Sequence, residues 1–337
     1  MLNFDEDRFL NSQIGAVSCA DALYQVVADR LSSGAENLFF AGAGGAGILM
    51  WPAAALLTRR STLTTLIERP AELVAGGSVN LGARSIVVIP SRSGDTPESL
   101  EALRYAKALG ACITTFTGTR DSLLGQEADF DFTNPVGDEN SSESFYLQSL
   151  LFALAVMDVR GEVEGHDELV TEIRRIPEAL LEAKHSFEHE AAKMADQIAA
   201  APYHIITGAG STWPEAMYYG MCILEEMQWI RTRPVHAADF FHGPLELVEP
   251  GVSCLLMKGD DWSRPLVDRV ERFVRSYSDR LMLLDTASVA MPGISEQLRA
   301  FISPVVLATL LERLSAHLEV KRSHPLTTRR YYRAVTY

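Results

Sequence analysis

Two stretches of the chain share one pattern and decide the fold. Asn37 to Gly47 reads N-L-F-F-A-G-A-G-G-A-G, and Tyr203 to Trp213, 166 residues later, reads Y-H-I-I-T-G-A-G-S-T-W. In each stretch an apolar run of strand length ends in a glycine turn. Because similarity at a fixed offset is typical of repeated architecture, the sequence predicts two copies of one unit.

Two further pairs of apolar runs follow at nearly the same offset. Ser85 to Pro90 matches Ser253 to Lys258, and Cys112 to Thr119 matches Leu281 to Ser288. The runs lack polar alternation, and helical stretches such as Thr96 to Leu109 and Pro265 to Tyr277 separate them. Continuous apolar strands that alternate with helices predict an α/β fold, in which each half is a doubly wound parallel sheet flanked by helices.

The two halves are predicted to meet near residue 165. The segment from Arg160 to Asp167 is polar and contains two glycines, as expected of a domain boundary. We therefore expect one domain over residues 1–165 and a second over residues 166–337. Helical segments between Leu169 and Ala200 would link them.

Composition and charge narrow the function. The 337 residues include 44 Asp and Glu against 30 Lys and Arg, for a net charge of -14, with 47% hydrophobic residues. Binding to nucleic acid or to an anionic membrane needs clustered Lys and Arg, so both are disfavoured. Four scattered cysteines indicate reduced thiols. No secretory signal and no apolar run of roughly 20 residues is found, and a cytoplasmic location is expected.

The loop that follows the run Ile86 to Ile89 reads S-R-S-G-D-T-P-E from residue 91. Thr96 is a natural N-cap, and Pro97 fits the first turn of a helix. Free backbone N–H groups at this helix start would meet the hydroxyls of Ser91, Ser93 and Thr96. The sequence therefore predicts a phosphate cradle, with an ordinary hydroxyl-rich turn as the alternative.

The matching loop of the second half reads G-D-D-W-S from Gly259 to Ser263. Its two carboxylates would repel a phosphate. We therefore expect one substrate per chain, with other chemistry supplied by the second half.

The first glycine turn allows two interpretations. Gly42, Gly44 and Gly47 satisfy G-x-G-x-x-G, and Glu68 lies 21 residues beyond, which is a dinucleotide fingerprint on paper. The repeat, however, has Trp213 in place of the third glycine. The alternative is that Gly44 and Gly45 let the backbone approach a sugar held by the neighbouring loop.

Candidate acid and base groups gather in the second half. A helix from about Pro214 to Trp229 would bring Glu225 or Glu226 to a cleft, and Asp239 to Pro244 forms a loop whose aromatic residues would partly shield His242 from water. A desolvated Glu226 suits carbon acid chemistry, and His242 suits proton transfer at sugar oxygens.

Each of these groups taken alone is more often structural, and a metal site is the further alternative. His236, Asp239 and His242 could ligate zinc, but Gly243 and Pro244 discourage the helical turn that this would need. We expect neither a metal nor a cofactor.

At this point the sequence resembles a known family. Two glycine strand turns, the S-R-S-G-D-T loop, and a Glu followed sixteen residues later by H-G-P are similar to the double-SIS (sugar isomerase) proteins. These include the isomerase part of glucosamine-6-phosphate synthase and the fructosamine-6-phosphate deglycases. The resemblance covers essentially the whole chain and implies two tandem SIS domains.

The resemblance also implies roles for individual residues. Glu226 would shuttle protons between sugar carbons, and His242 would serve ring opening and acid-base work. Ser141 would line the sugar site. The residues that match the sugar-phosphate loop are Ser91, Arg92, Ser93 and Thr96. Because the family's histidine loop is donated across a dimer, a homodimer with its active site at the subunit interface is implied.

One departure separates the family's branches. The synthase uses a tail lysine, and counting from Pro325 its place is taken by Arg330. A guanidinium stays protonated and cannot form an imine with a keto sugar. The resemblance therefore implies a deglycase, which hydrolyses a 6-phosphorylated glycated amino acid, an Amadori product, to a hexose 6-phosphate and the amino acid. Arg329 or Arg330 would meet the amino-acid carboxylate.

Two alternatives stay open at this point. A hexosamine-6-phosphate deaminase or isomerase would use the same superfamily chemistry, and a sensor would bind sugar phosphate without turnover. The residues leave open which amino acid is attached, whether the sugar is fructosyl or glucosyl, and how Glu225, Glu226, His236 and His242 divide their roles.

Overall fold

The computed structural model describes the whole chain except residues 138–140, 333 and 337. The chain forms two compact units. The N-terminal unit comprises Glu6–Glu178 and Gly293–Phe301, and the C-terminal unit comprises Met1–Asp5, Ala179–Pro292 and Ile302–Tyr337.

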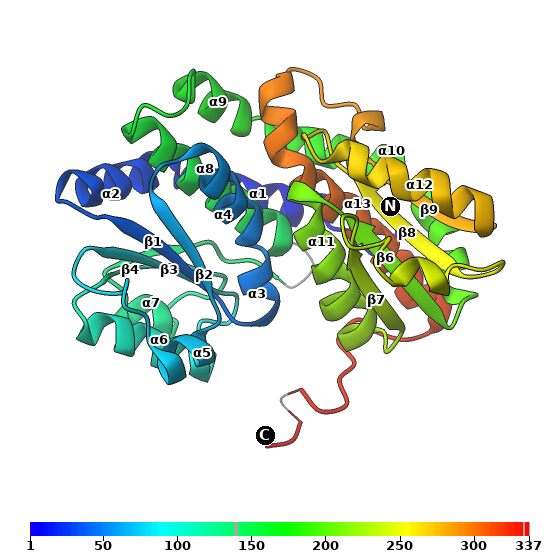
Figure 1. Cartoon of the computed structure of the whole chain (residues 1–337), viewed down its shortest axis with the longest axis horizontal. Helices are drawn as coiled ribbons and strands as arrows, with labels where there is room; N and C mark the ends of the chain where they lie inside the picture. Colours follow the sequence, from blue (N-terminus) through cyan, green and yellow to red (C-terminus); the bar gives the residue numbers. More distant parts are fainter. Residues whose placement is uncertain (138–140, 333, 337) are drawn as a thin grey trace. The chain divides into compact units, whose positions relative to one another are not determined.

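The N-terminal unit is built on a parallel sheet of five strands in the order β2-β1-β3-β4-β5 (Figure 1). The strands are β1 Asn37–Ala41, β2 Thr64–Glu68, β3 Ser85–Ser91, β4 Cys112–Thr117 and β5 Phe130–Thr133. The helices are α1 Glu6–Ser18, α2 Ala20–Ser32, α3 Gly44–Ile48, α4 Trp51–Arg60, α5 Pro70–Gly76, α6 Pro97–Ala108, α7 Leu123–Glu127, α8 Ser141–Val159 and α9 His166–Ile173.

Helices cover both faces of this sheet because successive strand residues point to opposite sides. Phe39 packs into a core with Leu103 of α6 and Leu124 of α7. Its neighbour Phe40 faces the other way and meets Phe152 of α8 edge to face, with ring centroids 6.3 Å apart. Strands buried on both faces explain the continuous apolar runs.

The C-terminal unit repeats the plan with a parallel sheet in the order β7-β6-β8-β9. Its strands are β6 Tyr203–Gly208, β7 Arg231–His236, β8 Ser253–Lys258 and β9 Arg280–Asp285. The helical elements, of which α10 and α13 have their first residues in the N-terminal unit, are α10 Ile176–Ala199, η2 Gly210–Thr212, α11 Trp213–Tyr218, η3 Tyr219–Met227, η4 Pro244–Leu247, α12 Arg264–Tyr277, η5 Thr286–Ser288 and α13 Glu296–Arg322.

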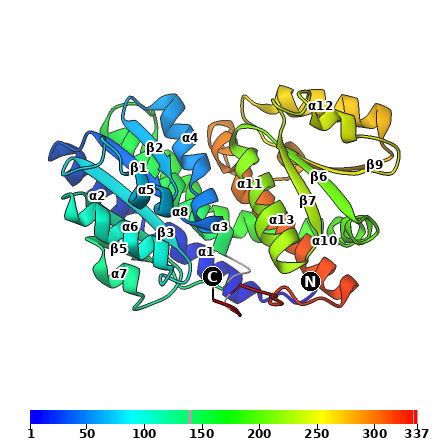
Figure 2. The ribbon, with the colours of Figure 1, turned by 60° about the horizontal axis from the view of Figure 1, so that its bottom comes forward.

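Here too, opposite strand faces carry different helices (Figure 2). Ile205 packs with Val267 and Val270 of α12. Ile206, the next residue, packs with Leu310 and Leu314 of α13. Each sheet is therefore the middle layer of its own αβα sandwich.

The predicted α/β repeat is confirmed. The three matched apolar runs are β1 with β6, β3 with β8 and β4 with β9. The helices predicted over Thr96 to Leu109 and Pro265 to Tyr277 are α6 and α12. Strand β1 lies between β2 and β3, and strand β6 lies between β7 and β8. The order of the strands in the sheet therefore repeats along with the sequence.

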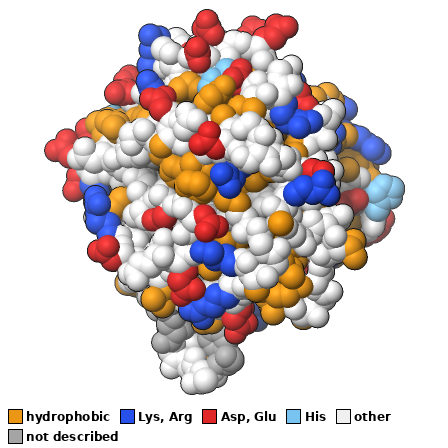
Figure 3. Space-filling view, turned by 90° about the vertical axis from the view of Figure 1, so that its left-hand side faces the viewer, with side chains coloured by type: hydrophobic (Ala, Val, Ile, Leu, Met, Phe, Trp, Pro, Cys, Tyr) orange, Lys and Arg blue, Asp and Glu red, His pale blue; other side chains and the backbone are white. Residues whose placement is uncertain are grey.

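Within the described part of the chain, one helix is long and apolar enough to cross a membrane by length and composition. It is α13, and 83% of its most apolar window is buried inside the protein. Leu307, Leu311 and Leu318 of this helix belong to the core of the C-terminal unit. Core packing therefore accounts for its apolar character. On the face shown in Figure 3, acidic and basic side chains are interspersed.

Candidate functional site

The loop after β3 folds on the hydroxyl of Ser91, the last residue of that strand. Ser91 is buried, and its Oγ accepts a hydrogen bond of 3.0 Å from the N–H of Gly94. Gly94 has a φ of +66°, a conformation that glycine adopts at little cost. Thr96 is the N-cap residue of α6, as predicted, but its hydroxyl lies 3.2 Å from Ser91 Oγ and does not cap the helix.

The remaining residues of this loop are partly exposed. Arg92 and Ser93 are half-buried, and the Arg92 carbonyl accepts hydrogen bonds of 3.0 Å from Gly118 N–H and from Thr119 Oγ1. These two bonds fix the backbone on one side of the loop. Ser93 lies in the chain between the residue with the fixed carbonyl and Gly94.

The glycine turn after β1 leaves the same edge of the sheet, because β1 and β3 are parallel neighbours. Gly44 opens α3 with a φ of +52°, and Gly45 follows it. A Cβ on Gly42 would lie 2.4 Å from the Cα of Gly47, so these two glycines allow the strand and the helix to pack closely. Close packing therefore explains the G-x-G-x-x-G spacing without a dinucleotide.

Ser141 lies in the same unit as these loops. It is the first residue of α8, and only 5% of its surface is exposed. Residues 138–140, which precede it, lie outside the described part of the chain. The structure thus places Gly44, Gly45 and the loop from Ser91 to Thr96 at one edge of the sheet, with Ser141 at a helix start after β5.

The helix predicted from Pro214 to Trp229 has an unusual second half. Its first part is α11, and the continuation η3 is a π-helix over Tyr219–Met227. The Gln228 N–H donates to the carbonyl of Ile223, five residues back, at 3.1 Å. π-Helical turns are rare and frequently occur at functional sites.

Glu225 and Glu226, at the end of this π-helix, have different partners. Glu225 Oε1 accepts hydrogen bonds from Thr232 of β7, at 2.7 Å from Oγ1 and 3.3 Å from N. Glu226 Oε1 lies 3.0 Å from Nε of Arg329 in the C-terminal tail. Glu226 is therefore the glutamate that is tied to the tail, while Glu225 is tied to the sheet.

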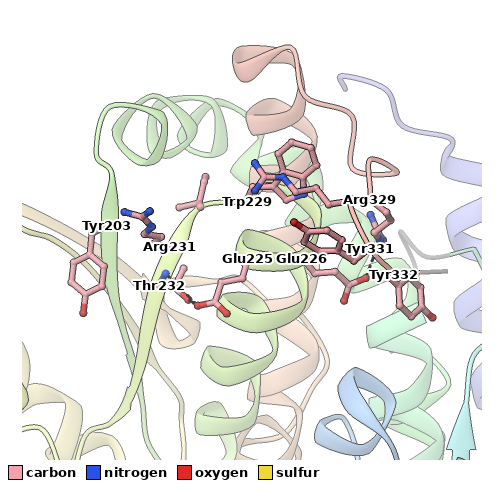
Figure 4. Close-up of a pocket in the computed structure, with 11 residues that line it drawn as sticks. Tyr203, Glu225, Glu226, Trp229, Arg231, Thr232, Arg329, Tyr331 and Tyr332 are labelled. Carbon is pink, nitrogen blue, oxygen red and sulfur yellow. Dashed lines mark hydrogen bonds and ion pairs between the residues drawn. The ribbon is translucent and has the colours of Figure 1, made fainter. Parts of the chain in front are cut away.

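Both glutamates line a pocket of about 660 Å³ within the C-terminal unit (Figure 4). The pocket lies between the end of the π-helix, the start of β7 and the tail. Its lining residues are Tyr203, Glu225, Glu226, Trp229, Ile230, Arg231, Thr232, Arg329, Arg330, Tyr331 and Tyr332. Glu226 has a side chain 36% exposed, so it reaches both solvent and tail.

Cys222 lies one turn before Glu226 and is buried, which makes it poorly suited to act as a nucleophile. Burial, reinforced by the negative charge of Glu226, raises the pKa of its thiol to about 12. The thiolate form that would attack a substrate is therefore scarce at neutral pH.

The expectation that aromatic neighbours shield His242 is wrong. His242 is exposed, and its backbone N–H donates to the Asp239 carbonyl at 2.9 Å. Phe240 turns inward instead, fully buried, and its ring meets those of Phe241 and Phe273. The aromatic residues pack onto α12 and leave the histidine outside. His242 is not among the residues that line the pocket of Glu226.

His236 lies at the end of β7 in a different setting. Its Nδ1 accepts from the Ala238 N–H at 3.1 Å, and its ring stands 5.4 Å from that of Trp213. Burial lowers the pKa of His236, while nearby Asp239 opposes the shift. Among the described residues, no group of three His, Cys, Asp or Glu side chains has the arrangement of a metal site.

A model of the SIS domain matches residues 33–158 of the chain. Fructosamine deglycase FrlB of Bacillus subtilis is 30% identical over 90% of this chain and 93% of its own length. The chain belongs to the fructosamine deglycase family. Fructoselysine 6-phosphate deglycase of Escherichia coli K12 is 25% identical over 92% of this chain and 89% of its own. The boundary between two SIS domains, expected near residue 165, stays a prediction.

Solved structures support the same fold for this member of the deglycase family. A candidate phosphosugar isomerase from Bacillus subtilis superposes with a TM-score of 0.89 at 27% identity, over 96% of this chain and 99% of the other. The C-terminal domain of glucosamine-fructose-6-phosphate aminotransferase from Francisella tularensis has a TM-score of 0.79 at 16% identity, over 95% and 94%. At that identity the likeness shows the fold alone.

The predicted site residues of this deglycase-family chain fall in two sets. Gly44, Gly45, Ser141 and the loop from Ser91 to Thr96 belong to the N-terminal unit, and Glu226, His242 and Arg330 belong to the C-terminal unit. Within the second set, Glu226 and Arg330 share one pocket.

Sequence reasoning missed several pocket residues. Trp229 was predicted only as a helix end, yet it lines the pocket three residues after Glu226. Its spacing from Glu226 was a usable signal, but its φ of +54° was not readable from the sequence. Tyr331 and Tyr332 of the tail also line the pocket, and sequence reasoning assigned them no role.

Proposed function

We propose that this protein is a deglycase that hydrolyses a 6-phosphorylated fructosyl- or glucosyl-amino acid to a hexose 6-phosphate and the free amino acid. The observation that carries the proposal is the lining of the Glu226 pocket. A carboxylate on a π-helix lines this pocket together with three arginines, and none of the described lining residues is a lysine. The names of the relatives agree with this activity.

The lysines help to distinguish a deglycase from a synthase, because the resemblance described above implies a tail lysine in the glucosamine-6-phosphate synthases. Aminotransferases such as that of Brucella abortus are 27% identical over 71% of this chain. All five lysines of the chain are in ion pairs elsewhere: Lys107 with Asp129, Lys184 with Glu312, Lys193 with Glu190, Lys258 with Asp268 and Glu271, and Lys321 with Asp196. No amine is thus at hand for an imine, whereas a glycated amino acid brings its own nitrogen.

In the fructosyl case the carboxylate of Glu226 removes a proton from C1 of the ketosamine and returns it to C2. The C2 carbonyl oxygen takes up a proton and becomes a hydroxyl, and the nitrogen loses its proton as the C1–N single bond becomes an imine, so no net proton is gained or lost. Water then adds to C1 of the imine, the C–N bond breaks, and the nitrogen leaves with a proton as the free amine. Glu226 ends the cycle as it began, as is required of a catalytic base.

We assign the sugar phosphate to the hydroxyls of Ser91, Ser93 and Thr96, with Gly44 and Gly45 next to it at the same sheet edge. Phosphate binding at backbone N–H groups beside a helix start is a recurrent arrangement. Arg92 and Ser141 would contact the sugar.

The proposal includes a homodimer in the cytoplasm, without a metal or cofactor. His242 is exposed and lies outside the pocket of Glu226, which supports an active site completed by a second copy of the chain. In that assembly the exposed loop from Asp239 to Pro244 would carry the histidine to the partner's sugar.

The test is a panel of substrates combined with a single substitution. We expect release of hexose 6-phosphate from one or more 6-phosphofructosyl or 6-phosphoglucosyl amino acids, and none from free glucosamine 6-phosphate. E226Q should lower kcat by at least about 1,000-fold, since it removes the base but keeps the shape. Hexose 6-phosphate should still bind with nearly unchanged affinity.

E225Q is the matched control because its carboxylate is bound to Thr232. It should lower kcat by less than about 10-fold. Turnover that survives in E226Q would refute the catalytic assignment. Turnover of glucosamine 6-phosphate alone would favour the deaminase, and binding without any turnover would favour a sensor.

A further inference from the structure

We propose that Arg330, stacked on Trp229, binds the carboxylate of the amino acid that leaves, and that this contact makes the enzyme selective for glycated amino acids over glycated amines. The inference rests on the proposed function and specifies the substrate of the same pocket. It separates Arg330 from its neighbour Arg329, which the sequence did not do.

The platform for this contact is a tryptophan in a conformation that costs free energy. Trp229 has a φ of +54°, which is uncommon for a bulky side chain. Its ring is held edge to face against His324, with centroids 4.5 Å apart. Gln228 Nε2 donates to the His324 carbonyl at 2.7 Å, and Arg322 donates to Gln228 Oε1 at 3.0 Å. Strain of this kind persists where the surroundings fix it, often at ligand sites.

Arg330 lies on this platform. Its guanidinium carbon is 3.9 Å from the centroid of the Trp229 ring, so one flat face is covered by the indole. Stacking leaves the N–H edge of a guanidinium available, and that edge matches a carboxylate with two parallel hydrogen bonds. Among the described residues, no carboxylate lies within ion-pair distance of Arg330, whose side chain is exposed.

Arg329 is occupied differently. Its Nε pairs with Glu226 at 3.0 Å, and its Nη1 donates to the carbonyls of Leu326 at 2.7 Å and Thr328 at 3.0 Å. The two hydrogen bonds hold the guanidinium against the tail backbone, and the ion pair keeps it beside Glu226. Arg329 is therefore a positioning residue, which leaves Arg330 for the substrate.

The charge of the pocket points the same way. Glu225 is bound to Thr232 and Glu226 to Arg329, while neither Arg231 nor Arg330 has an acidic partner in the described part of the chain. The pocket thus has surplus positive charge beside the acid-base group. In a glycated amino acid, the group that reaches past the reacting carbon and nitrogen is the carboxylate.

The test compares substrates that differ in that carboxylate alone. One pair is 6-phosphofructosyl-lysine and 6-phosphofructosyl-cadaverine, both joined through the terminal amine, and a second is 6-phosphofructosyl-glycine and 6-phosphofructosyl-methylamine. For the pair turned over faster, the unaltered enzyme should show a kcat/KM at least about 10-fold higher with the carboxylate. R330Q should remove this preference by raising KM, with kcat within about 2-fold.

Two variants and one binding measurement complete the design. R330K keeps the positive charge but cannot form two parallel hydrogen bonds with a carboxylate. It should therefore retain part of the preference that R330Q loses. R60Q removes an exposed arginine that lies 5.5 Å from the ring of Phe301 in the N-terminal unit, and should leave the preference unchanged. Hexose 6-phosphate should bind R330Q as it binds the unaltered enzyme, which shows that the variant is folded and that the phosphate lies elsewhere.

Equal kcat/KM for both members of each pair would overturn the inference, as would an R330Q variant that loses the same factor on both. Loss of hexose 6-phosphate binding in a folded R330Q would assign the arginine to the phosphate instead. If the unaltered enzyme turns over no glycated substrate at all, the proposed function fails, and the carboxylate assignment fails with it.

Discussion

The loops that follow β3 and β8 occupy the same place in the two sheets, but only the second carries a carboxylate that is bound by backbone N–H groups. Each leads into a helix with a proline in its first turn, Pro97 in α6 and Pro265 in α12. In the second loop the carboxylate of Asp261 accepts hydrogen bonds of 2.8 Å from the N–H groups of Ser211 and Ser263. The C-terminal unit thus fills its own N–H cradle with an internal anion.

The repeat shows what stands in the equivalent place of the first loop. Counting from the matched strands, Gly45 corresponds to Ser211 and Ser93 to Asp261. Gly45 N–H has no carboxylate partner among the described residues. The C-terminal unit therefore has a carboxylate of its own, Asp261, bound to these N–H groups, whereas the N-terminal unit has the hydroxyl of Ser93 at the matching position. An external anion such as a sugar phosphate suits the first copy.

The largest effect should come from placing the second loop's anion in the first. S93D puts a carboxylate where the proposed phosphate binds, and two like charges about 4 Å apart repel strongly near a protein surface. We expect the affinity for hexose 6-phosphate to fall by about 100-fold or more, measured by isothermal titration.

S93N is the matched control, because it has nearly the same shape without the charge. It should weaken binding by less than about 10-fold. Equal affinities of S93D and S93N for hexose 6-phosphate would show that the phosphate lies elsewhere. The difference between the two loops would then not explain where the phosphate binds.

This comparison also marks what the sequence could and could not predict. The strand pairs and the contrast between the loops were readable, because buried parallel strands and loop carboxylates leave a local pattern. The exposure of His242 was not, since the direction of Phe240 depends on packing against α12. The pairing of Glu226 with Arg329 joins residues 103 positions apart and follows from the path of the tail. No local periodicity encodes such a path.

A smaller effect is expected from removing the internal anion. D261S leaves the N–H groups of Ser211 and Ser263 without their acceptor, which should lower the free energy of unfolding by about 1–3 kcal/mol. If Asp261 stands in for an anion, inorganic phosphate at about 20 mM should restore part of the lost stability. Thermal unfolding in phosphate and in chloride of equal ionic strength measures both.

D279S is the control for general effects of phosphate. Asp279 accepts from the Gly251 N–H at 2.9 Å in another loop of the same unit. Its loss should destabilise the protein without a specific response to phosphate. A D261S variant that responds to phosphate no more than D279S does would mean that Asp261 is an ordinary loop carboxylate.

The smallest effect concerns the two glycines that open the cradles, Gly44 with a φ of +52° and Gly210 with a φ of +54°. Alanine in this left-handed conformation costs about 1–2 kcal/mol at either position. A Cβ on Gly44 meets nothing within 4 Å, whereas one on Gly210 would lie 2.4 Å from Ser263 Oγ and 2.8 Å from the Asp261 carboxylate. Urea unfolding should therefore show that G210A loses at least about 1 kcal/mol more than G44A. Equal losses would contradict the view that one cradle is filled from within and the other is open, because an open cradle has room for the added carbon.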